Sequence, residues 1–356
     1  MIKILELFAG IGACSKAFEN LNIPHEIVDA VEIDKFAIKS FNAIHDTNFD
    51  PQDITKWNKD IKVDLIMHGS PCQDFSIAGK QAGGDKDSGT RSSLMYETLR
   101  IVEKLQPKYV IWENVKNLIS KKHIHNFNAY LQAMQNLGYN SYYKVLNAKD
   151  YGVPQNRERI FTISIRNDGN FDSYFEFPDP KPLDKTLKDI IDDEVDEKYY
   201  LSQSKIDMIS KWKCYEKPLE HIMNMESVVG TITTRSGAEC GGLKLLAIKT
   251  ANKRGYDIAT YGDGIDLAYP NSTTRRGKVG HQVSKTIATG NLQGCIDSTY
   301  RIRKLTPKEC FKLMGFSEDD YNKAASVCSS SQIYKQAGNS IVVNVLEEII
   351  KNLILS

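Results

Sequence analysis

A cysteine in an unusual setting is the first residue of this chain that could do chemistry. Residues 64–76 read DLIMHGSPCQDFS, so Cys72 follows a short apolar run and a Gly-Ser-Pro turn and precedes polar Gln73. A free cysteine is most often a small buried hydrophobe, but the turn and the polar neighbours favour a position outside the core. A thiolate is a strong nucleophile even at the small fraction present at neutral pH. We therefore interpret Cys72 as a candidate nucleophile at the end of a strand.

A carboxyl group and two arginines could serve the same reaction. Glu113 ends the run YVIWE, and Arg157 and Arg159 alternate within QNRER just before another apolar run. Alternate residues of a strand lie on one face, so both arginines are expected on the same side. A positioned carboxyl group can transfer a proton, and guanidinium groups can donate to a carbonyl oxygen or a phosphate.

A glycine turn with two acids indicates a bound nucleoside. FAGIG at 8–12 follows the first apolar run, where a glycine turn lets the backbone approach a ligand. It is shorter than GxGxxG, and such turns are also common for steric reasons alone. Glu32 and Asp53 follow at the ends of later runs, where a carboxylate can accept ribose hydroxyls. These residues favour a nucleoside-bearing cofactor and leave both a nicotinamide dinucleotide and S-adenosylmethionine open.

The elements that must position these residues form an alternating pattern. Strands are predicted at 2–7, 26–31, 64–67, 109–112, 141–146 and 159–165, with helices between them at 13–20, 35–44, 92–105 and 127–137. This alternation predicts an α/β fold with a mostly parallel, doubly wound sheet whose carboxyl edge carries the candidate residues. Three prolines within 178–182 mark a linker. Residues 183–300 have weak periodicity and predict a smaller, irregular second domain, after which helical patterning returns.

Bulk composition excludes several classes of protein. No run of 18 apolar residues is present, so no transmembrane helix is expected. The N-terminus lacks a signal-peptide pattern, and we expect a cytoplasmic protein. The seven cysteines are scattered without a CxxC spacing, which argues against a disulfide framework and against a metal site.

The net charge of +1 hides an asymmetry. Residues 171–200 contain ten acidic and four basic residues, whereas residues 235–312 contain fourteen basic and six acidic ones. The basic segment includes Arg275, Arg276 and Lys278 among many polar residues, a composition that suits phosphates and base edges. A solvated basic face is the alternative.

These motifs, in this order, resemble the DNA cytosine-C5 methyltransferase family. The resemblance covers almost the whole chain except about 183–300, and rests on FAGIG (8–12), GSPCQDFS (69–76), ENV (113–115), QNRER (155–159), RKLTPKECFKLMGF (303–316) and QAGNSIVVNV (336–345). It implies a Rossmann-like sheet that binds S-adenosylmethionine and a target-recognition domain. We expect the catalytic domain at 1–182, completed by 328–356, and the target-recognition domain at 183–327. One departure is Ile33, where relatives often carry an aromatic residue against the adenine.

The resemblance also implies roles for individual residues. Cys72 would add to carbon 6 of a flipped-out cytosine, with Glu113, Arg157 and Arg159 as the other catalytic residues. The expected cofactor-binding residues are Phe8, Ala9, Gly10, Ile11, Gly12, Glu32, Ile33, Asp53, Ile54, Ser70, Pro71, Asn339 and Ser340. The expected DNA-binding residues are Gln73, Ser76, Lys80, Arg91, Arg275 and Arg276, and the glycine-rich stretch 76–94 is expected to close as a lid over the flipped base.

Three other functions compete with this interpretation. An RNA methyltransferase acting on transfer RNA is the alternative, because one branch of the family has nearly the same motifs; the long basic region favours duplex DNA. A DNA-binding regulator without catalysis conflicts with the intact Cys72, Glu113 and Arg159. A nicotinamide-dependent oxidoreductase leaves those three residues unexplained. We expect a monomer, with a cognate restriction endonuclease as a further partner to consider.

Overall fold

The computed structural model describes residues 1–71, 94–169, 174–210, 246–290 and 292–355. The chain divides into two compact units. Unit 1 comprises Met1–Asp184, Ile287–Gly290 and Pro307–Ser356, and unit 2 comprises Lys185–Thr286 and Asn291–Thr306. The first segment of unit 1 ends at Asp184, close to the boundary expected at residue 182. Unit 1 also includes Ile287–Gly290 and Pro307–Val327, which the sequence analysis assigned to the second domain.

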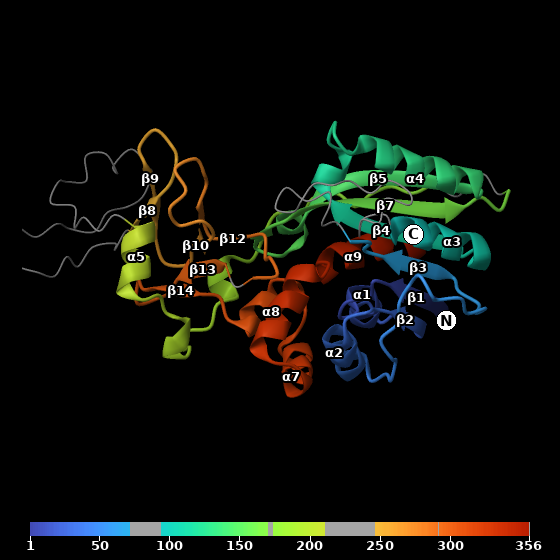
Figure 1. The fold of residues 1–356 in the computed structure, drawn as a ribbon, viewed down its shortest axis with the longest axis horizontal. Helices are drawn as coiled ribbons and strands as arrows, with labels where there is room; N and C mark the ends of the chain where they lie inside the picture. The colour runs from blue at the N-terminus through green and yellow to red at the C-terminus, as the bar shows by residue number, and fades with distance from the viewer. Residues whose placement is uncertain (72–93, 170–173, 211–245, 291, 356) are drawn as a thin grey trace, which may run out of the picture. The chain divides into compact units, whose positions relative to one another are not determined.

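Unit 1 is built on a six-stranded sheet with the order β2-β1-β3-β4-β7-β5 (Figure 1). Its strands are β1 (Ile2–Leu7), β2 (His25–Val31), β3 (Leu65–His68), β4 (Tyr109–Val115), β5 (Tyr139–Asn147) and β7 (Glu158–Arg166), with the two-residue strand β6 (Gln155–Asn156) before β7. The first four strands of this order pair in parallel, and β7 pairs antiparallel with both β4 and β5. The predicted α/β fold is therefore confirmed, with an antiparallel edge added to the parallel part.

Helices cover the sheet on both faces. The first four are α1 (Ala13–Asn20), α2 (Lys35–His45), α3 (Met95–Leu105) and α4 (Ile124–Asn136). Side chains of α3 and α4 form one core cluster with one face of the sheet, through residues such as Leu5, Ile66 and Trp112. The alternate residues Ile4, Leu65 and Ile111 are also fully buried. Burial of both faces is what makes these strands continuous apolar runs in the sequence.

The C-terminal segment completes unit 1. Its helices are α6 (Pro307–Lys312), α7 (Glu318–Val327), α8 (Ser330–Asn339) and α9 (Val343–Ile350), and a π-helical turn follows at Lys351–Leu355. Helix α9 packs against α1, and α7 packs against α2. The Nζ atom of Lys16 lies 2.8 Å from Oδ1 of Asp320 and ties α1 to α7. This packing explains why α6 and α7 belong to unit 1.

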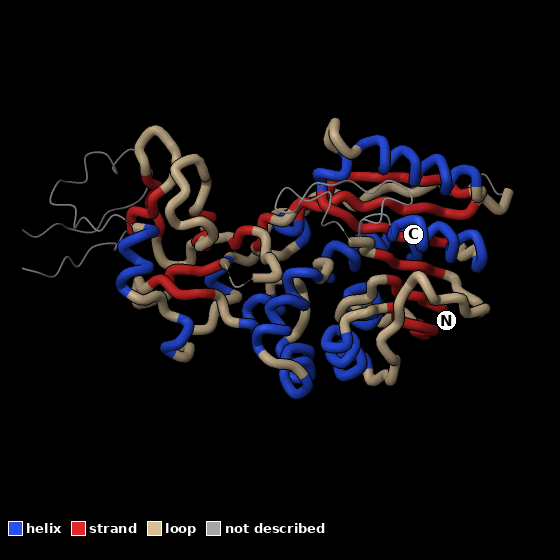
Figure 2. The backbone as a smooth tube through the Cα atoms, in the orientation of Figure 1, coloured by secondary structure: helices blue, strands red, loops and turns tan. Residues whose placement is uncertain are grey.

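Unit 2 consists of short strands joined by long loops (Figure 2). Strands β10 (Gly264–Asp266), β11 (Val279–Gly280), β13 (Gln293–Ile296) and β14 (Ile302–Lys304) form an antiparallel sheet, and β8 (Leu246–Lys249) pairs with β9 (Tyr256–Ala259). Unit 2 also contains helix α5 (Gln203–Ile209), the short strand β12 (Ser284–Lys285) and two 3-10 turns at Leu187–Asp189 and Glu197–Tyr199. A small apolar cluster around Ile248, Ile265 and Ile296 forms its core.

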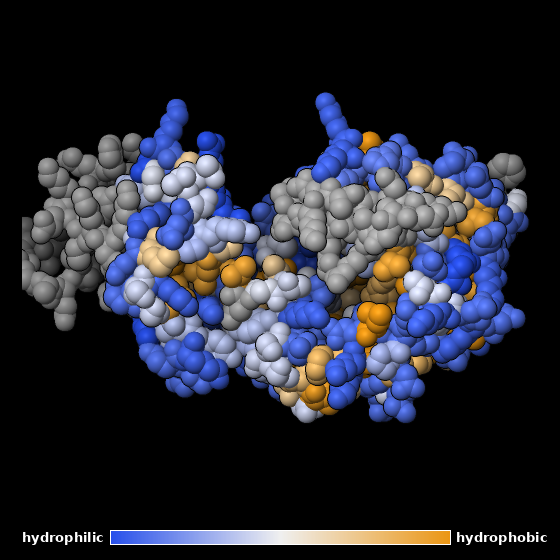
Figure 3. Space-filling view, in the orientation of Figure 1, coloured by the Kyte–Doolittle hydropathy of each residue, from blue (hydrophilic) through white to orange (hydrophobic). Residues whose placement is uncertain are grey.

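Hydrophilic side chains dominate the described surface in the view of Figure 3, where hydrophobic residues gather only in small patches. Among the described residues, no helix combines the length and the apolar character that crossing a membrane requires.

Candidate functional site

The glycine turn after β1 is held by a carboxylate from the next strand. The Gly10 amide donates to Oε2 of Glu32 at 3.0 Å, and the Asp34 amide donates to Oε1 of the same side chain at 2.8 Å. Gly10 has φ +58°, a left-handed conformation that favours glycine. Burial raises the pKa of Glu32, although backbone amides that donate to the carboxylate oppose the increase. Glu32 thus fixes the turn at the carboxyl edge of the sheet.

Three further expected cofactor residues are Ile33, Asp53 and Ile54. Ile33 follows Glu32 and is 72% exposed, so its side chain offers an apolar surface to solvent. Asp53 accepts hydrogen bonds from the Thr55 amide (3.0 Å) and hydroxyl (2.8 Å), which lower the pKa of its carboxyl group. Ile54 is buried. The carboxylate of Asp53 is therefore ionised and held in one orientation.

Asp29, which the sequence analysis did not single out, holds the loop that carries Asp53 in place. Asp29 on β2 is fully buried and accepts from Gln52 Nε2 (2.7 Å) and Trp57 Nε1 (2.8 Å), and its Oδ2 atom lies 2.8 Å from Lys59 Nζ. These three partners flank Asp53 on both sides. A buried acid within an apolar strand was the available signal, because such a group must find partners.

The segment after β3 leads toward the candidate nucleophile. Ser70 is buried, and its hydroxyl accepts from Trp112 Nε1 at 3.0 Å while its carbonyl accepts from Asn114 Nδ2 at 3.3 Å. Pro71 is the last described residue of this segment. The candidate residues Cys72, Gln73, Ser76, Lys80 and Arg91, and the expected lid at 76–94 apart from Leu94, lie outside the described residues.

His68, at the end of β3, packs among aromatic side chains. It is fully buried, its ring stacks on Trp112 at 5.5 Å between centroids, and Nε2 lies 3.0 Å from the Tyr130 hydroxyl. Burial lowers the pKa of His68 to about 3, so the ring stays neutral.

Glu113 and Arg159 meet beside this segment. The Nε atom of Arg159 lies 3.0 Å from Oε1 of Glu113, because β4 and β7 are neighbours in the sheet. A Cβ atom placed on Gly69 would lie 3.8 Å from Oε2 of Glu113, so the carboxyl group borders the backbone that leads to Cys72. Burial raises the pKa of Glu113, and the opposing charges of Arg159 and Arg157 do not offset this effect.

Arg157 does not lie as the sequence analysis expected. It is buried, and its guanidinium group donates to the carbonyl oxygens of Ile287 (2.8 Å), Gly338 (3.2 Å) and Ser340 (2.8 Å). The alternation of Arg157 and Arg159 suggested one shared face, but β6 ends at Asn156 and β7 begins only at Glu158. Arg157 therefore supports the site through the backbone, and Arg159 is the arginine next to the carboxyl group.

Gln155, which the sequence analysis did not single out, also holds these segments together. Its Nε2 donates to the Leu313 carbonyl at 2.6 Å, and its Oε1 accepts from the Ile287 amide at 3.0 Å. Ser340 is buried at the end of α8, and Asn339 is exposed beside it. Gln155 and Arg157 thus join the end of α8 and the segment 287–290 to the sheet.

In unit 2 the basic residues differ in their surroundings. Arg275 forms an ion pair with Asp266 at 2.7 Å, and its guanidinium lies 5.2 Å from the Tyr269 ring centroid. Arg276 is exposed and donates to the Ala251 carbonyl at 3.2 Å. Lys278 is buried, so it is not part of a basic surface as the charge count suggested.

The described residues contain no group of three or more His, Cys, Asp or Glu side chains that could hold a metal ion.

Known proteins resemble this chain in sequence and in fold. The C-5 cytosine-specific DNA methylase family matches residues 2–355. Type II methyltransferase M2.ScrFI of Lactococcus lactis subsp. cremoris is 32% identical, with the whole of both chains covered. Orphan methyltransferase M.SPRI of Bacillus phage SPR is also 32% identical over 99% of this chain and 97% of its own. The solved structure of DNMT2 from Spodoptera frugiperda has a TM-score of 0.64 over 99% of each chain at 20% identity, a likeness of fold.

Proposed function

Because the chain belongs to the C-5 cytosine-specific DNA methylase family, we propose that it methylates carbon 5 of a flipped-out cytosine in a specific sequence of double-stranded DNA, with Cys72 as the nucleophile. The observation that carries this proposal is the Glu113–Arg159 pair beside Gly69. Gly69 lies three residues before the cysteine along the chain, and the pair beside it can receive a pyrimidine ring edge.

The cofactor of this family is S-adenosylmethionine, which supplies the methyl group as an electrophilic sulfonium. The residues at the carboxyl edge of unit 1 suit it. The Glu32 carboxylate can accept ribose hydroxyls, the ionised Asp53 can accept from the adenine amine, and the exposed Ile33 side chain can cover the ring. Phe8–Gly12, Ile54, Ser70, Pro71, Asn339 and Ser340 complete the proposed cofactor site.

In the proposed reaction, each residue acts at a defined step. The Cys72 thiolate adds to carbon 6, and the electron pair of the double bond makes carbon 5 nucleophilic. Protonated Glu113 gives its proton to N3 as charge develops on the ring. Arg159 donates to O2, while Arg157 holds the backbone in place. Carbon 5 takes the methyl group and then loses its proton to water. N3 returns its proton to Glu113 as elimination releases the Cys72 thiolate and 5-methylcytosine.

We propose unit 2 as the part that recognises the DNA sequence, and Arg276 as a residue that contacts a phosphate. Gln73, Ser76, Lys80 and Arg91 remain proposed DNA contacts in the segment after the nucleophile. We propose a monomer, and a cytoplasmic location because scattered cysteines without a CxxC spacing suit a reducing compartment. Relatives that act as orphan methyltransferases give no support for a cognate endonuclease.

Transfer of a labelled methyl group to DNA and to total tRNA in parallel tests the substrate. We expect label in DNA only, since the family and the named relatives at 32% identity are DNA enzymes and the tRNA alternative is not favoured. Bisulfite sequencing of the modified DNA then identifies the recognised sequence. Label in tRNA alone, or at a base other than cytosine, would overturn the proposal.

A further inference from the structure

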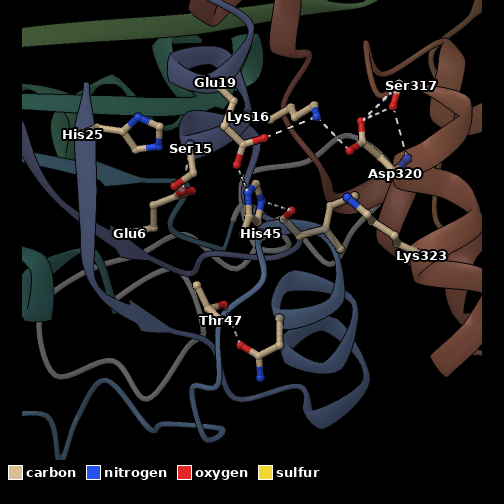
Figure 4. A network of polar contacts seen from close by, with 12 residues as sticks. Glu6, Ser15, Lys16, Glu19, His25, His45, Thr47, Ser317, Asp320 and Lys323 are labelled. Atoms are coloured by element: carbon tan, nitrogen blue, oxygen red, sulfur yellow. Dashed lines mark hydrogen bonds and ion pairs between the residues drawn. The ribbon is translucent and has the colours of Figure 1, made fainter. Parts of the chain in front are cut away.

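A buried histidine contacts the glycine turn from behind. His45 ends α2, its side chain is fully buried, and its Nε2 lies 3.1 Å from the carbonyl oxygen of Ile11, in the middle of the turn (Figure 4). Its Nδ1 lies 2.6 Å from Oε1 of Glu19 on α1. Gly12 makes this approach possible, because a Cβ atom there would lie 2.1 Å from His45 Nε2.

The partners of His45 determine where its protons are. A carbonyl oxygen only accepts hydrogen bonds, so Nε2 must carry a proton to bond Ile11. A carboxylate also only accepts, so a second proton lies between Nδ1 and Glu19. A neutral imidazole has one N–H, and without the second proton one of its nitrogens would present a lone pair to an acceptor. Both contacts are therefore made together only while the His45–Glu19 pair holds that second proton.

The charged groups nearest the pair come from α1, α7 and β1. On α1, Lys16 lies 3.3 Å from Glu19 Oε2, and on α7, Asp320 pairs with Lys16. On β1, buried Glu6 accepts from the Ser15 amide and hydroxyl, and burial raises the pKa of Glu6. At the opposite end of α2, Lys335 of α8 pairs with Asp34.

The carboxyl group of Glu19 responds to these neighbours. Its partial burial raises its pKa, but His45 and Lys16 outweigh that effect and bring the pKa below its ordinary value.

We propose that His45 is a positioning residue for the cofactor turn, and that the proton it shares with Glu19 makes cofactor affinity depend on pH. The inference rests on the proposed function, because it takes Phe8–Gly12 to be the cofactor turn. When the shared proton is lost at alkaline pH, either the Ile11 contact or the Glu19 contact becomes repulsive. The turn is then held less firmly, and it binds the cofactor more weakly.

Glu19→Gln separates this role from general packing. A glutamine amide can donate to Nδ1, so a neutral His45 keeps its Nε2–H for Ile11 at every pH. His45→Asn removes the contact to the turn. His25→Asn is the matched control, because His25 is a partly buried histidine of unit 1 whose Nδ1 faces the Ile23 carbonyl at 2.8 Å, away from the turn.

The experiment measures S-adenosylhomocysteine binding by calorimetry from pH 6.5 to 9.5. This ligand lacks the labile sulfonium, and its own titration is the same for all variants. We expect the wild type to bind more weakly relative to Glu19→Gln as the pH rises. The ratio of the wild-type Kd to the Glu19→Gln Kd should increase about tenfold over this range, which is the effect of one charge-assisted hydrogen bond. We expect His45→Asn to bind about tenfold more weakly than wild type at pH 7, and His25→Asn to follow the wild type.

The wild type and Glu19→Gln decide the question by themselves. A ratio of Kd values that stays constant with pH would overturn the role of His45. Glu32→Ala keeps the two proposals apart: normal binding by this variant would show that the proposed cofactor site is wrong. Weak binding by Glu32→Ala together with a constant ratio would refute the His45 inference alone.

Discussion

Arg159 Nε lies 3.0 Å from Glu113 Oε1, yet the pKa of Glu113 is raised. A neighbouring positive charge favours the carboxylate, whereas burial favours the neutral acid. Burial dominates here, because Glu113 is almost completely buried between β3 and β7, while the side chain of Arg159 is partly exposed. The pair therefore offers a proton and a fixed positive charge at the same place, which is what addition to a pyrimidine ring requires.

Cys72→Ser is expected to abolish methylation and to leave S-adenosylmethionine binding close to normal. A serine alkoxide is far harder to form at neutral pH than a thiolate, and the proposed cofactor contacts come from other residues. With 5-fluorocytosine at the target, the wild type should form an adduct that survives denaturation, because fluorine blocks the final loss of the C5 proton. Full activity in the serine variant, or no adduct with the wild type, would remove Cys72 from the mechanism.

Glu113→Gln is expected to lower the single-turnover rate at least about a hundredfold, since an amide cannot transfer a proton. The raised pKa also predicts the shape of the pH profile. The wild-type rate should fall as the pH rises through the pKa of Glu113, where the acid loses its proton, and this alkaline decrease should be absent from the variant. An unchanged rate would show that the carboxyl group is not near the ring.

The same substitution has a predicted effect on stability. A carboxyl group whose pKa is raised by folding contributes stability below its unfolded pKa, and this contribution is lost as the pH rises through the folded pKa. Glu113→Gln should therefore be more stable than the wild type at pH 8, and the difference should shrink toward pH 4. Urea titrations at the two pH values measure it; a variant less stable at pH 8 would contradict the raised pKa.

Arg157→Met is expected mainly to lower stability, and Arg159→Met mainly to lower the methylation rate. The first leaves three buried carbonyl oxygens without their donor and should lower the free energy of unfolding by about 3 kcal/mol. The second should cost less than half as much stability but slow methylation at least about a hundredfold. Chemical denaturation and single-turnover rates of both variants test this division, and equal stability losses would contradict it.

Arg276→Ala is expected to weaken DNA binding on all sequences and to reduce the slope of log affinity against log salt by about 1. Arg275→Ala should change that slope less, because Asp266 already compensates its charge. Binding of both variants to cognate and scrambled duplexes over a salt series measures the effect. Loss of discrimination at one base would instead indicate a contact with a guanine edge, and wild-type behaviour of Arg276→Ala would make the segment a solvated face.

The sequence predicted the sheet and its candidate edge because both depend on local signals. Apolar runs mark the buried strands. The FAGIG turn and Glu32 directly follow strands, and Glu113 lies within β4 near its end. Roles that depend on distant partners were not predictable in this way. Arg157 and Arg159 look equivalent in QNRER, but only the fold brings Ile287 and Ser340 to Arg157. Asp29 and His45 likewise acquire their partners from other segments of the chain.

The position of α6–α9 has a consequence for biosynthesis. A ribosome that makes about 5–20 residues per second needs roughly 10 s to pass from Asp184 to Pro307. During that time the nascent sheet lacks α9, the helix that packs against α1. Unit 2 emerges almost whole in the same interval. The half of the protein that is translated first is thus finished last, because the surface that α1 presents to α9 stays uncovered until the C-terminal segment has been made.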